Sequence, residues 1–442
     1  MSVNEPKERT QNAADPKGAA SVKVLQATKD ASAYQKEWFM GLRQRVANGE
    51  PFGFLNADVP MELFRAMDIP FVVNQWWAAI CSAKQMSPYF FGLLKESSYR
   101  EDLCSYCATS LATALDPKPQ EGPWGGLPKP TVAVTRLTCD SQGKIFELFA
   151  KQHGIPFYPM ENTIPLIAPD KWWEKAPLQW EELYESHRLD MAVEEMKGLI
   201  RFLELSTGKM FSETALEKVM DLVNQQEQYY KMTRDLIART SPAPVTIADT
   251  VGGVMIPQWQ RGTKWAVESA RSLYEEIKDM ADRGVAACPN ERIRLMWIGR
   301  GLWFNLGFYQ YFEQKYGAVF VWSMYLAMGA DAYIRHGGDP LRRLASRFMG
   351  MEDFLHMPPW NNQWFLKEAI SNKIDGAVYL VPENCMQAVE GSQFITKILE
   401  DAGIPVLQLR ADPVDARKWN QKTMTEAVEG FIEKRLGGKA NV

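Results

Sequence analysis

The clearest indication of the fold is TVAVTRLTCDSQGKIFELFAKQHGIPFYPM, residues 131–160. TVAVTR predicts a buried strand, and the apolar residues that follow at three- and four-residue steps predict an amphipathic helix. Gly154 suits the C-terminal cap of that helix, and Pro156 stops the helix at the edge of the next strand. Strand, helix and strand in this order form the βαβ unit of a parallel sheet with helices on its faces.

The same unit recurs along the chain. Ile-Pro opens an apolar run after a helix-like segment in MDIPFVVNQ (67–75), HGIPFYPME (153–161) and AGIPVLQLRAD (402–412). Further strands are predicted after residue 290, in RLMWI (294–298) and GAVYLV (376–381). Between the two strand-bearing regions, residues 175–285 place apolar residues at helical steps on charged segments, which indicates packed helices with solvated outer faces.

We therefore predict an α/β fold with two doubly wound, Rossmann-like parallel-sheet domains and a helical layer between them. The predicted boundaries are residues 1–30 for a flexible polar tail, 31–170 for the first α/β domain, 171–290 for the helical segment and 291–442 for the second α/β domain. A chain of 442 residues is too long for one ordinary core, which agrees with several domains.

Composition excludes some classes of function. The formal net charge is −4 and no long basic run is present, which argues against a nucleic-acid partner. The longest apolar run, YGAVFVWSMYLAMGA (316–330), is too short to span a bilayer, and the polar N-terminal tail lacks the apolar core of a signal peptide. We therefore expect a cytoplasmic protein without a membrane partner.

Cysteines stand where predicted strands end. Cys139 follows TVAVTRLT, and Cys385 follows GAVYLV in the other predicted domain, so the two sulfurs converge if the domains face each other. EDLCSYCATSL adds Cys104 or Cys107 at a helix start, where backbone N–H groups favour a thiolate. Three thiolates suit a 4Fe–4S cluster with one iron that lacks a protein ligand, and three unrelated buried thiols are the alternative.

From about residue 50 to residue 435 the chain resembles the benzoyl-CoA reductase and 2-hydroxyacyl-CoA dehydratase family, and the larger reductase core subunit in particular. The motifs that carry the resemblance are EDLCSY, LTCDSQGKIFELF, VPENC, GIPVLQLRADPVDARKWN and YGAVFVWSMYLAMGADAYIRHGGDPLRRLASRF. Each motif is short, but their order and spacing together are specific.

The resemblance implies a set of ligands and partners. Cys104, Cys139 and Cys385 would bind one 4Fe–4S cluster with an open iron, whereas Cys107 would not be a ligand and the other two cysteines would pack in the core. The family pairs two related cluster-bearing subunits, with the acyl-CoA thioester at their interface. A separate ATP-hydrolysing activator supplies a low-potential electron. A homologous core subunit and an activator are therefore the expected partners.

The implied activity is that of an oxidoreductase, which delivers low-potential electrons to an aromatic acyl-CoA thioester and dearomatises its ring. A 2-hydroxyacyl-CoA dehydratase subunit, a lyase that recycles its electron, uses the same cluster and is the first alternative. A non-catalytic electron-relay subunit is the second alternative.

The turn GRGLWFN, residues 299–305, is the candidate substrate site. Gly299 and Gly301 allow close backbone approach, and the following helix start favours an anionic group. Trp303 is a candidate wall of an apolar acyl pocket, with core packing or a subunit contact as the alternative. We predict solvated surface positions for Arg300 and Lys144, rather than a role beside the cluster. No residue stands out as a proton donor.

Overall fold

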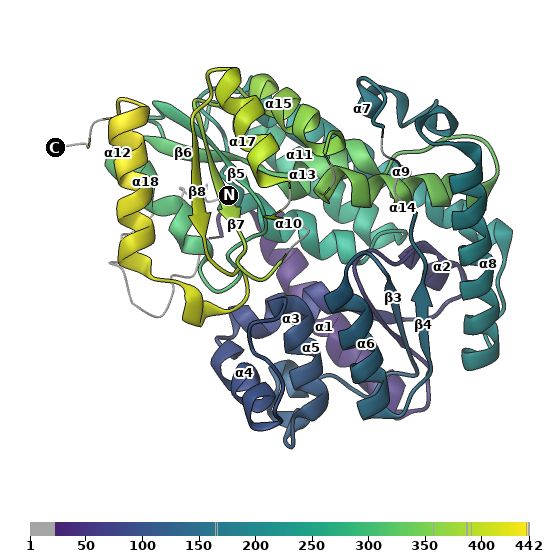
Figure 1. The fold of residues 1–442 in the computed structure, drawn as a ribbon. Coiled ribbons are helices and arrows are strands. Elements are labelled where there is room, and N and C mark those ends of the chain that lie inside the picture. The colour runs from purple at the N-terminus through teal and green to yellow at the C-terminus, as the bar shows by residue number, and fades with distance from the viewer. Residues whose placement is uncertain are drawn as a thin grey trace, which may run out of the picture.

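Two four-stranded sheets organise the molecule (Figure 1). The computed structural model describes residues 23–163, 165, 167–356, 358–385, 388–389, 391–438 and 440, with only the backbone described for 352–356. The strands of the first sheet are β1 (Gly53–Leu55), β2 (Phe71–Val73), β3 (Val132–Arg136) and β4 (Phe157–Met160). Those of the second are β5 (Ile293–Ile298), β6 (Ala318–Ser323), β7 (Gly376–Val381) and β8 (Val406–Arg410).

Every paired strand is parallel, in the orders β2-β1-β3-β4 and β6-β5-β7-β8. The prediction of an α/β protein with two parallel sheets is therefore confirmed, and the three Ile-Pro units lead into β2, β4 and β8 as expected. Pro159 lies in the edge strand β4, where its missing N–H disrupts no inner pairing. The doubly wound, Rossmann-like detail stays a prediction, as do the domain boundaries.

Helices pack around and between the sheets. Those of the N-terminal part are α1 (Gln26–Ala47), α2 (Met61–Ala66), α3 (Asn74–Ala83), α4 (Ser87–Glu96), α5 (Ser105–Leu115), α6 (Asp140–His153) and α7 (Trp172–Lys175). The middle part holds α8 (Ser186–Thr207), α9 (Glu213–Arg239), α10 (Ile247–Trp259) and α11 (Lys264–Asp282). The C-terminal part holds α12 (Tyr311–Tyr316), α13 (Met324–Ala332), α14 (Pro340–His356), α15 (Trp360–Ser371), α17 (Ser392–Asp401) and α18 (Gln421–Arg435).

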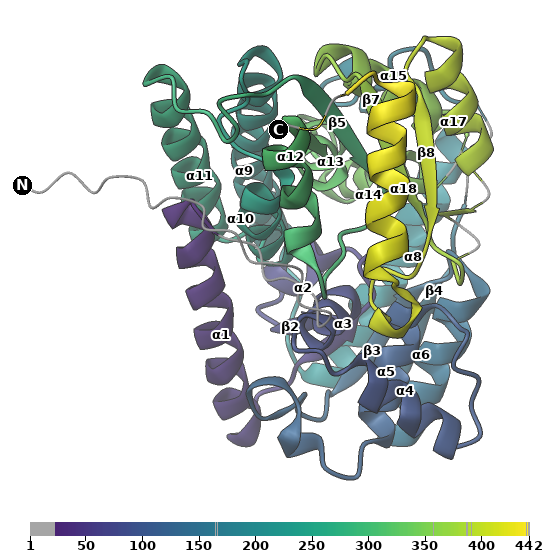
Figure 2. The same cartoon turned by 90° about the vertical axis from the view of Figure 1, so that its left-hand side faces the viewer.

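The middle helices contact elements of both sheet-bearing regions. α9 packs against α2 beside the first sheet and against α13 beside the second, while α10 packs against α1, α13 and β6. Figure 2 shows α1, α9, α10 and α11 along one side of the molecule. No helix among the described residues is long and apolar enough to cross a membrane.

Helical structure begins inside the segment predicted as an N-terminal tail. Helix α1 begins at Gln26, inside the segment 1–30 that the sequence assigned to a flexible tail, whereas residues 1–22 lie outside the described residues. The reason is tertiary: the carboxylate of Glu276 on α11 accepts the N–H groups of Gln26 and Ala27 at 2.7 and 2.9 Å. A carboxylate at this end satisfies donors that the helix cannot pair itself.

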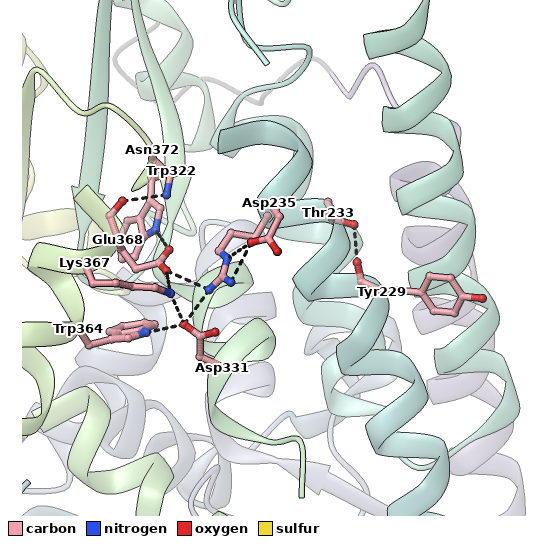
Figure 3. Close-up of polar contacts among 10 residues, drawn as sticks. Tyr229, Thr233, Asp235, Trp322, Asp331, Trp364, Lys367, Glu368 and Asn372 are labelled. Carbon is pink, nitrogen blue, oxygen red and sulfur yellow. Dashed lines mark hydrogen bonds and ion pairs between the residues drawn. The ribbon is translucent and has the colours of Figure 1, made fainter. Parts of the chain in front are cut away.

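A cluster of buried charges holds the helices beside the second sheet (Figure 3). Arg234 on α9 places Nη1 2.7 Å from Asp331 Oδ2 and 3.0 Å from Glu368 Oε1. Lys367 contacts the same two carboxylates at 2.8 and 2.6 Å. The indole N–H groups of Trp364 and Trp322 donate to Asp331 and Glu368, respectively. Arg234 also pairs with the half-exposed Asp235 at 2.9 Å. The two cations thus balance the two buried carboxylates, and the cluster ties α9, α13, α15 and β6 together.

A second buried group of charges is less well balanced. Glu62 on α2 has Oε1 2.9 Å from both Arg261 Nε and Arg347 Nη1. Glu227 on α9 is also fully buried, yet neither of its carboxylate oxygens has a well-formed hydrogen bond to a described residue. Burial raises the pKa of Glu227 to about 8, although Gln258 and the two arginines offset part of that effect. Glu227 is therefore protonated at neutral pH.

Glu227→Gln is expected to change how stability depends on pH. When folding raises the pKa of a carboxyl group, the native state binds its proton more tightly than the unfolded chain does. The free energy of unfolding therefore falls as the pH rises from about 4.3, the pKa of an unfolded Glu, toward the folded pKa of about 8. That fall is on the order of 1 kcal/mol per pH unit. Urea unfolding at pH 5 and pH 8 should show that the variant gains stability relative to the native protein at the higher pH. An equal difference at both pH values would contradict this prediction.

Candidate functional site

The strand order of each sheet reverses at its centre. In the first sheet the neighbours are β1 and β3, and in the second they are β5 and β7. Chains that leave such strands diverge and open a crevice at the carboxyl edge of a parallel sheet. A cavity of about 600 Å³ lies at these edges. Each of the four central strands is followed within a few residues by a side chain that lines it, namely Asp58, Cys139, Arg300 and Cys385. The two sheets therefore share one site.

Three of the cysteines that the sequence singled out line this cavity. Cys139 is the N-cap residue of α6 after β3, and Cys385 lies in the segment after β7. Cys104 is the N-cap residue of α5. The predicted positions at two strand exits and one helix start are those that the structure shows. Cys107 also lines the cavity, one turn into α5, so the structure alone does not choose between it and Cys104.

The thiols of the site differ in acidity. A hydrogen bond from the Cys107 side chain lowers the pKa of Cys104 to about 7, with a smaller contribution from the positive charge of Arg300. Burial raises the pKa of Cys139 to about 12, and burial also raises the pKa of Cys385. Cys104 is therefore the thiol most readily ionised near neutral pH, as expected at a helix N-terminus. The other two would need a nearby cation or metal to become thiolates.

Arg300 is that cation. Its Nη1 lies 3.7 Å from Cys385 Sγ, and it lines the cavity. Burial alone would lower the pKa of Arg300, but the negative charge of ionised Cys385, followed by Tyr106 and Cys104, raises it above its ordinary value. The predicted solvated position of Arg300 was wrong. Its position two residues after the end of β5, at the carboxyl edge of a parallel sheet, is the signal that could have revealed it.

Gly299 brings the chain close to β7 directly before Arg300. Its φ is +110°, and a Cβ there would lie 2.8 Å from the Leu380 carbonyl oxygen of β7. Only glycine fits such an approach at this φ.

Lys144, by contrast with Arg300, is a surface residue as predicted. Its side chain is 70% exposed and pairs with Glu147 at 2.7 Å.

The turn that follows Arg300 is only partly available to a ligand. Trp303 lines the cavity, and its indole N–H donates to Tyr106 Oη at 2.6 Å. The Gly301 N–H donates to Tyr325 Oη at 3.0 Å, and Gly301 is not among the described residues that line the cavity. The position of Trp303 is compatible with a wall of the acyl pocket. The backbone N–H of Gly301 is already donated to Tyr325, so it does not support the binding of an anion there. Both roles stay predictions.

Asp58 is a site residue that the sequence analysis missed. It is buried at the cavity, where Thr138 Oγ1 donates to its Oδ2 at 3.2 Å and the Gln142 amide lies at 3.4 Å. Burial raises the pKa of Asp58, with Arg136 opposing that effect. The signal in the sequence was its position three residues after the short strand GFL, equivalent to that of Cys139 after β3.

Helix faces supply the remaining walls, and these are mostly apolar. Residues of α3 and α10 that line the cavity recur at three- and four-residue steps, which places them on one face of each helix. They are Gln75, Trp76, Ala79, Ile80 and Ala83 on α3, and Ala248, Val251, Gly252, Met255, Ile256 and Trp259 on α10.

The donor set limits which metal centre fits. Among the described residues, no group of three or more His, Cys, Asp and Glu side chains is arranged to hold a single metal ion. A mononuclear zinc site, with sulfurs about 2.3 Å from one ion, does not match the cysteines. A polynuclear cluster spreads its cysteine ligands over separate irons and does not need that convergence. Three free cysteines around one cavity, with Arg300 beside them, fit such a cluster in chemistry and charge.

Comparison with known families now places the chain. A family model described as 2-hydroxyglutaryl-CoA dehydratase, D-component, matches residues 56–434. The chain belongs to this family. The match covers all three candidate cysteines and begins directly after β1. The predicted resemblance to the benzoyl-CoA reductase and 2-hydroxyacyl-CoA dehydratase family is therefore confirmed.

Two curated relatives of this dehydratase family are similar over most of their length. One is the (R)-2-hydroxyisocaproyl-CoA dehydratase alpha subunit of Clostridioides difficile, 22% identical over 87% of this chain and 90% of the relative. The other is the (R)-phenyllactyl-CoA dehydratase alpha subunit of Clostridium sporogenes, 22% identical over 88% of this chain and 91% of the relative. Both are dehydratase components, so the comparisons favour the lyase alternative over the reductase that the sequence analysis put first.

Proposed function

We propose that this protein is a cluster-binding subunit of a 2-hydroxyacyl-CoA dehydratase. The observation that carries the proposal is the meeting of Cys104, Cys139 and Cys385 around one cavity between two parallel sheets, in a chain of the dehydratase family. The reaction removes water from a 2-hydroxyacyl thioester and leaves a 2-enoyl thioester. No electron is consumed overall, because the substrate and the sum of its products have the same oxidation level.

The three cysteines would hold a 4Fe–4S cluster in this cavity. When bound, such a cluster supplies single electrons and an iron with an open coordination position. The chain's own contribution is electrostatic: Arg300 places a positive charge beside Cys385, which favours the thiolate form needed for ligation.

The walls of the cavity protect the reacting thioester. The helix faces of α3 and α10 are mostly apolar and limit the entry of water, which would quench reactive species. Asp58 places a carboxyl group beside the cysteines, and burial raises the pKa of that carboxyl group. The residues of the chain thus provide a largely apolar site in which Arg300 places a cation, and Asp58 a buried carboxyl group, near the cysteines.

The chain would work with other subunits. Both curated relatives are named as alpha subunits, which supports a second, non-identical subunit in the assembly. The family resemblance adds an ATP-hydrolysing activator that primes the complex with an electron. We extend both partners to this chain as part of the proposal.

The consumption of reductant tests the proposed reaction. In the complete complex with its activator, one priming electron should support many turnovers, and 2-enoyl-CoA should accumulate without a matching loss of reductant. Product can be quantified by chromatography while reductant is followed by absorbance. Two electrons consumed for each aromatic thioester converted would identify a ring reductase instead. Reduction and reoxidation of the iron without any product would indicate an electron-relay subunit.

A further inference from the structure

Part of the cavity wall is formed by four methionines and one phenylalanine, here named the methionine wall. Its members are Met255 on α10, Met324 and Met328 on α13, Met351 on α14 and Phe365 on α15. All five side chains line the cavity, yet each is less than one-tenth exposed. The wall is therefore shielded from bulk solvent, whereas Lys23 near the start of α1 is exposed.

The wall is continuous because its helices touch. α13 packs against both α10 and α14, and α14 packs against α15. The ring of Phe365 lies 5.7 Å from that of Trp322 in β6, nearly perpendicular to it. One turn beyond Met328 and Phe365, the buried charges of Asp331 and Glu368 bind Arg234 and Lys367 (Figure 3). These ion pairs hold α13 and α15 in place behind the wall.

Among the described residues, the wall itself carries no charged side chain. The basic residues among the described cavity lining are Lys23 and Arg300, and Arg300 is engaged beside Cys385. The hydroxyl of Tyr333, behind the wall, already donates to Met351 Sδ at 3.0 Å. Arg234 and Lys367 are balanced by two carboxylates and do not line the cavity. A carboxylate placed against the methionine wall would be buried without a counter-charge from the described lining residues, which is strongly unfavourable.

We propose that the methionine wall is the acyl site and that it selects a bulky, apolar acyl group over a dicarboxylic one. Unbranched, polarisable methionine side chains adapt to irregular shapes and contact aromatic rings favourably. The wall therefore accepts branched aliphatic and aromatic acyl groups alike. This inference rests on the proposed function, because it names the class of thioester that the same site takes.

Binding of unreactive thioesters tests the inference without turnover. The probes are 4-methylpentanoyl-CoA, 3-phenylpropanoyl-CoA and glutaryl-CoA, which lack the 2-hydroxyl group and cannot be dehydrated. Calorimetry with the anaerobically purified complex should show that the first two bind at least about tenfold more tightly than glutaryl-CoA. If all three fail to bind, the proposed function itself fails. If glutaryl-CoA binds equally well or better, the acyl selection is wrong while the thioester function stands.

A pair of methionine variants locates the acyl group. Met328→Ala removes apolar contacts from the wall and should weaken binding of 4-methylpentanoyl-CoA about tenfold, with little effect on glutaryl-CoA. Met210→Ala is the matched control, because Met210 is 71% exposed outside the cavity, and it should change neither affinity. Circular dichroism should show that both variants are folded. An unchanged preference between the two thioesters in Met328→Ala would overturn the placement at the wall.

Discussion

Replacement of Cys385 by alanine is expected to remove the iron from the anaerobically purified protein and to abolish turnover of its complex. A 4Fe–4S cluster held by three cysteines loses a third of its protein ligands in this variant, whereas the native chain should carry about four irons and four sulfides. Cys104→Ala and Cys139→Ala should have the same effect, because all three side chains line the one cavity. Colorimetric iron and sulfide assays and the visible absorption of the cluster measure the loss.

The neighbouring cysteine provides the control for this prediction. Cys107 borders the same cavity and is buried, but Cys107→Ala should keep the iron and the activity. Cys288→Ala is a second control, because Cys288 is buried outside the cavity and donates to the Glu313 carbonyl oxygen. Loss of iron from Cys107→Ala together with its retention in Cys104→Ala would show that the ligand was assigned to the wrong cysteine.

Arg234→Met should lower the free energy of unfolding by about 3–5 kcal/mol. Methionine keeps much of the side-chain volume but removes the cation that contacts Asp331 and Glu368, both of which are buried. Those two carboxylates would then share only Lys367, so negative charge would remain uncompensated in the core. Denaturant unfolding at neutral pH, followed by circular dichroism, measures the change.

An exposed ion pair serves as the comparison. Lys397 and Asp401 lie 2.8 Å apart on α17, with side chains 74% and 62% exposed. Lys397→Met should therefore change the unfolding free energy by no more than about 1 kcal/mol. If Arg234→Met were as mild as Lys397→Met, the buried cluster would not stabilise the helices behind the second sheet, and the support inferred for the methionine wall would be lost.

Local pattern was enough to predict the secondary structure around the site. TVAVTR forms β3, and the periodic segment after it forms α6, because alternation and helical spacing depend on residues close together in the chain. The same reasoning placed Cys139 and Cys385 at strand exits and Cys104 at a helix start, where the structure has them. Even the expectation of one shared crevice followed, because parallel strands present their carboxyl ends at one edge.

Other features of the site depend on contacts between distant parts of the chain. Arg300 looked like a solvated residue because nothing beside it in the sequence reports the Cys385 thiol, 85 positions away and 3.7 Å from it in space. Asp58 lies shortly after β1, but its local sequence does not report the thiols and the arginine that share its cavity. Gln26 entered a helix rather than a tail because Glu276, 250 positions later, accepts its N–H.

The two parallel sheets, the family and the strand-end positions of Cys139 and Cys385 were predictable from the sequence, because each depends on short-range periodicity or on motifs. Contacts between distant segments determine that Arg300 and Asp58 share the cavity with the thiols and that methionines from α10, α13 and α14 line part of it. Burial and charge compensation are properties of neighbours in space, which a local pattern does not report. A buried apolar helix face looks the same in sequence whether it meets another helix or borders a ligand cavity.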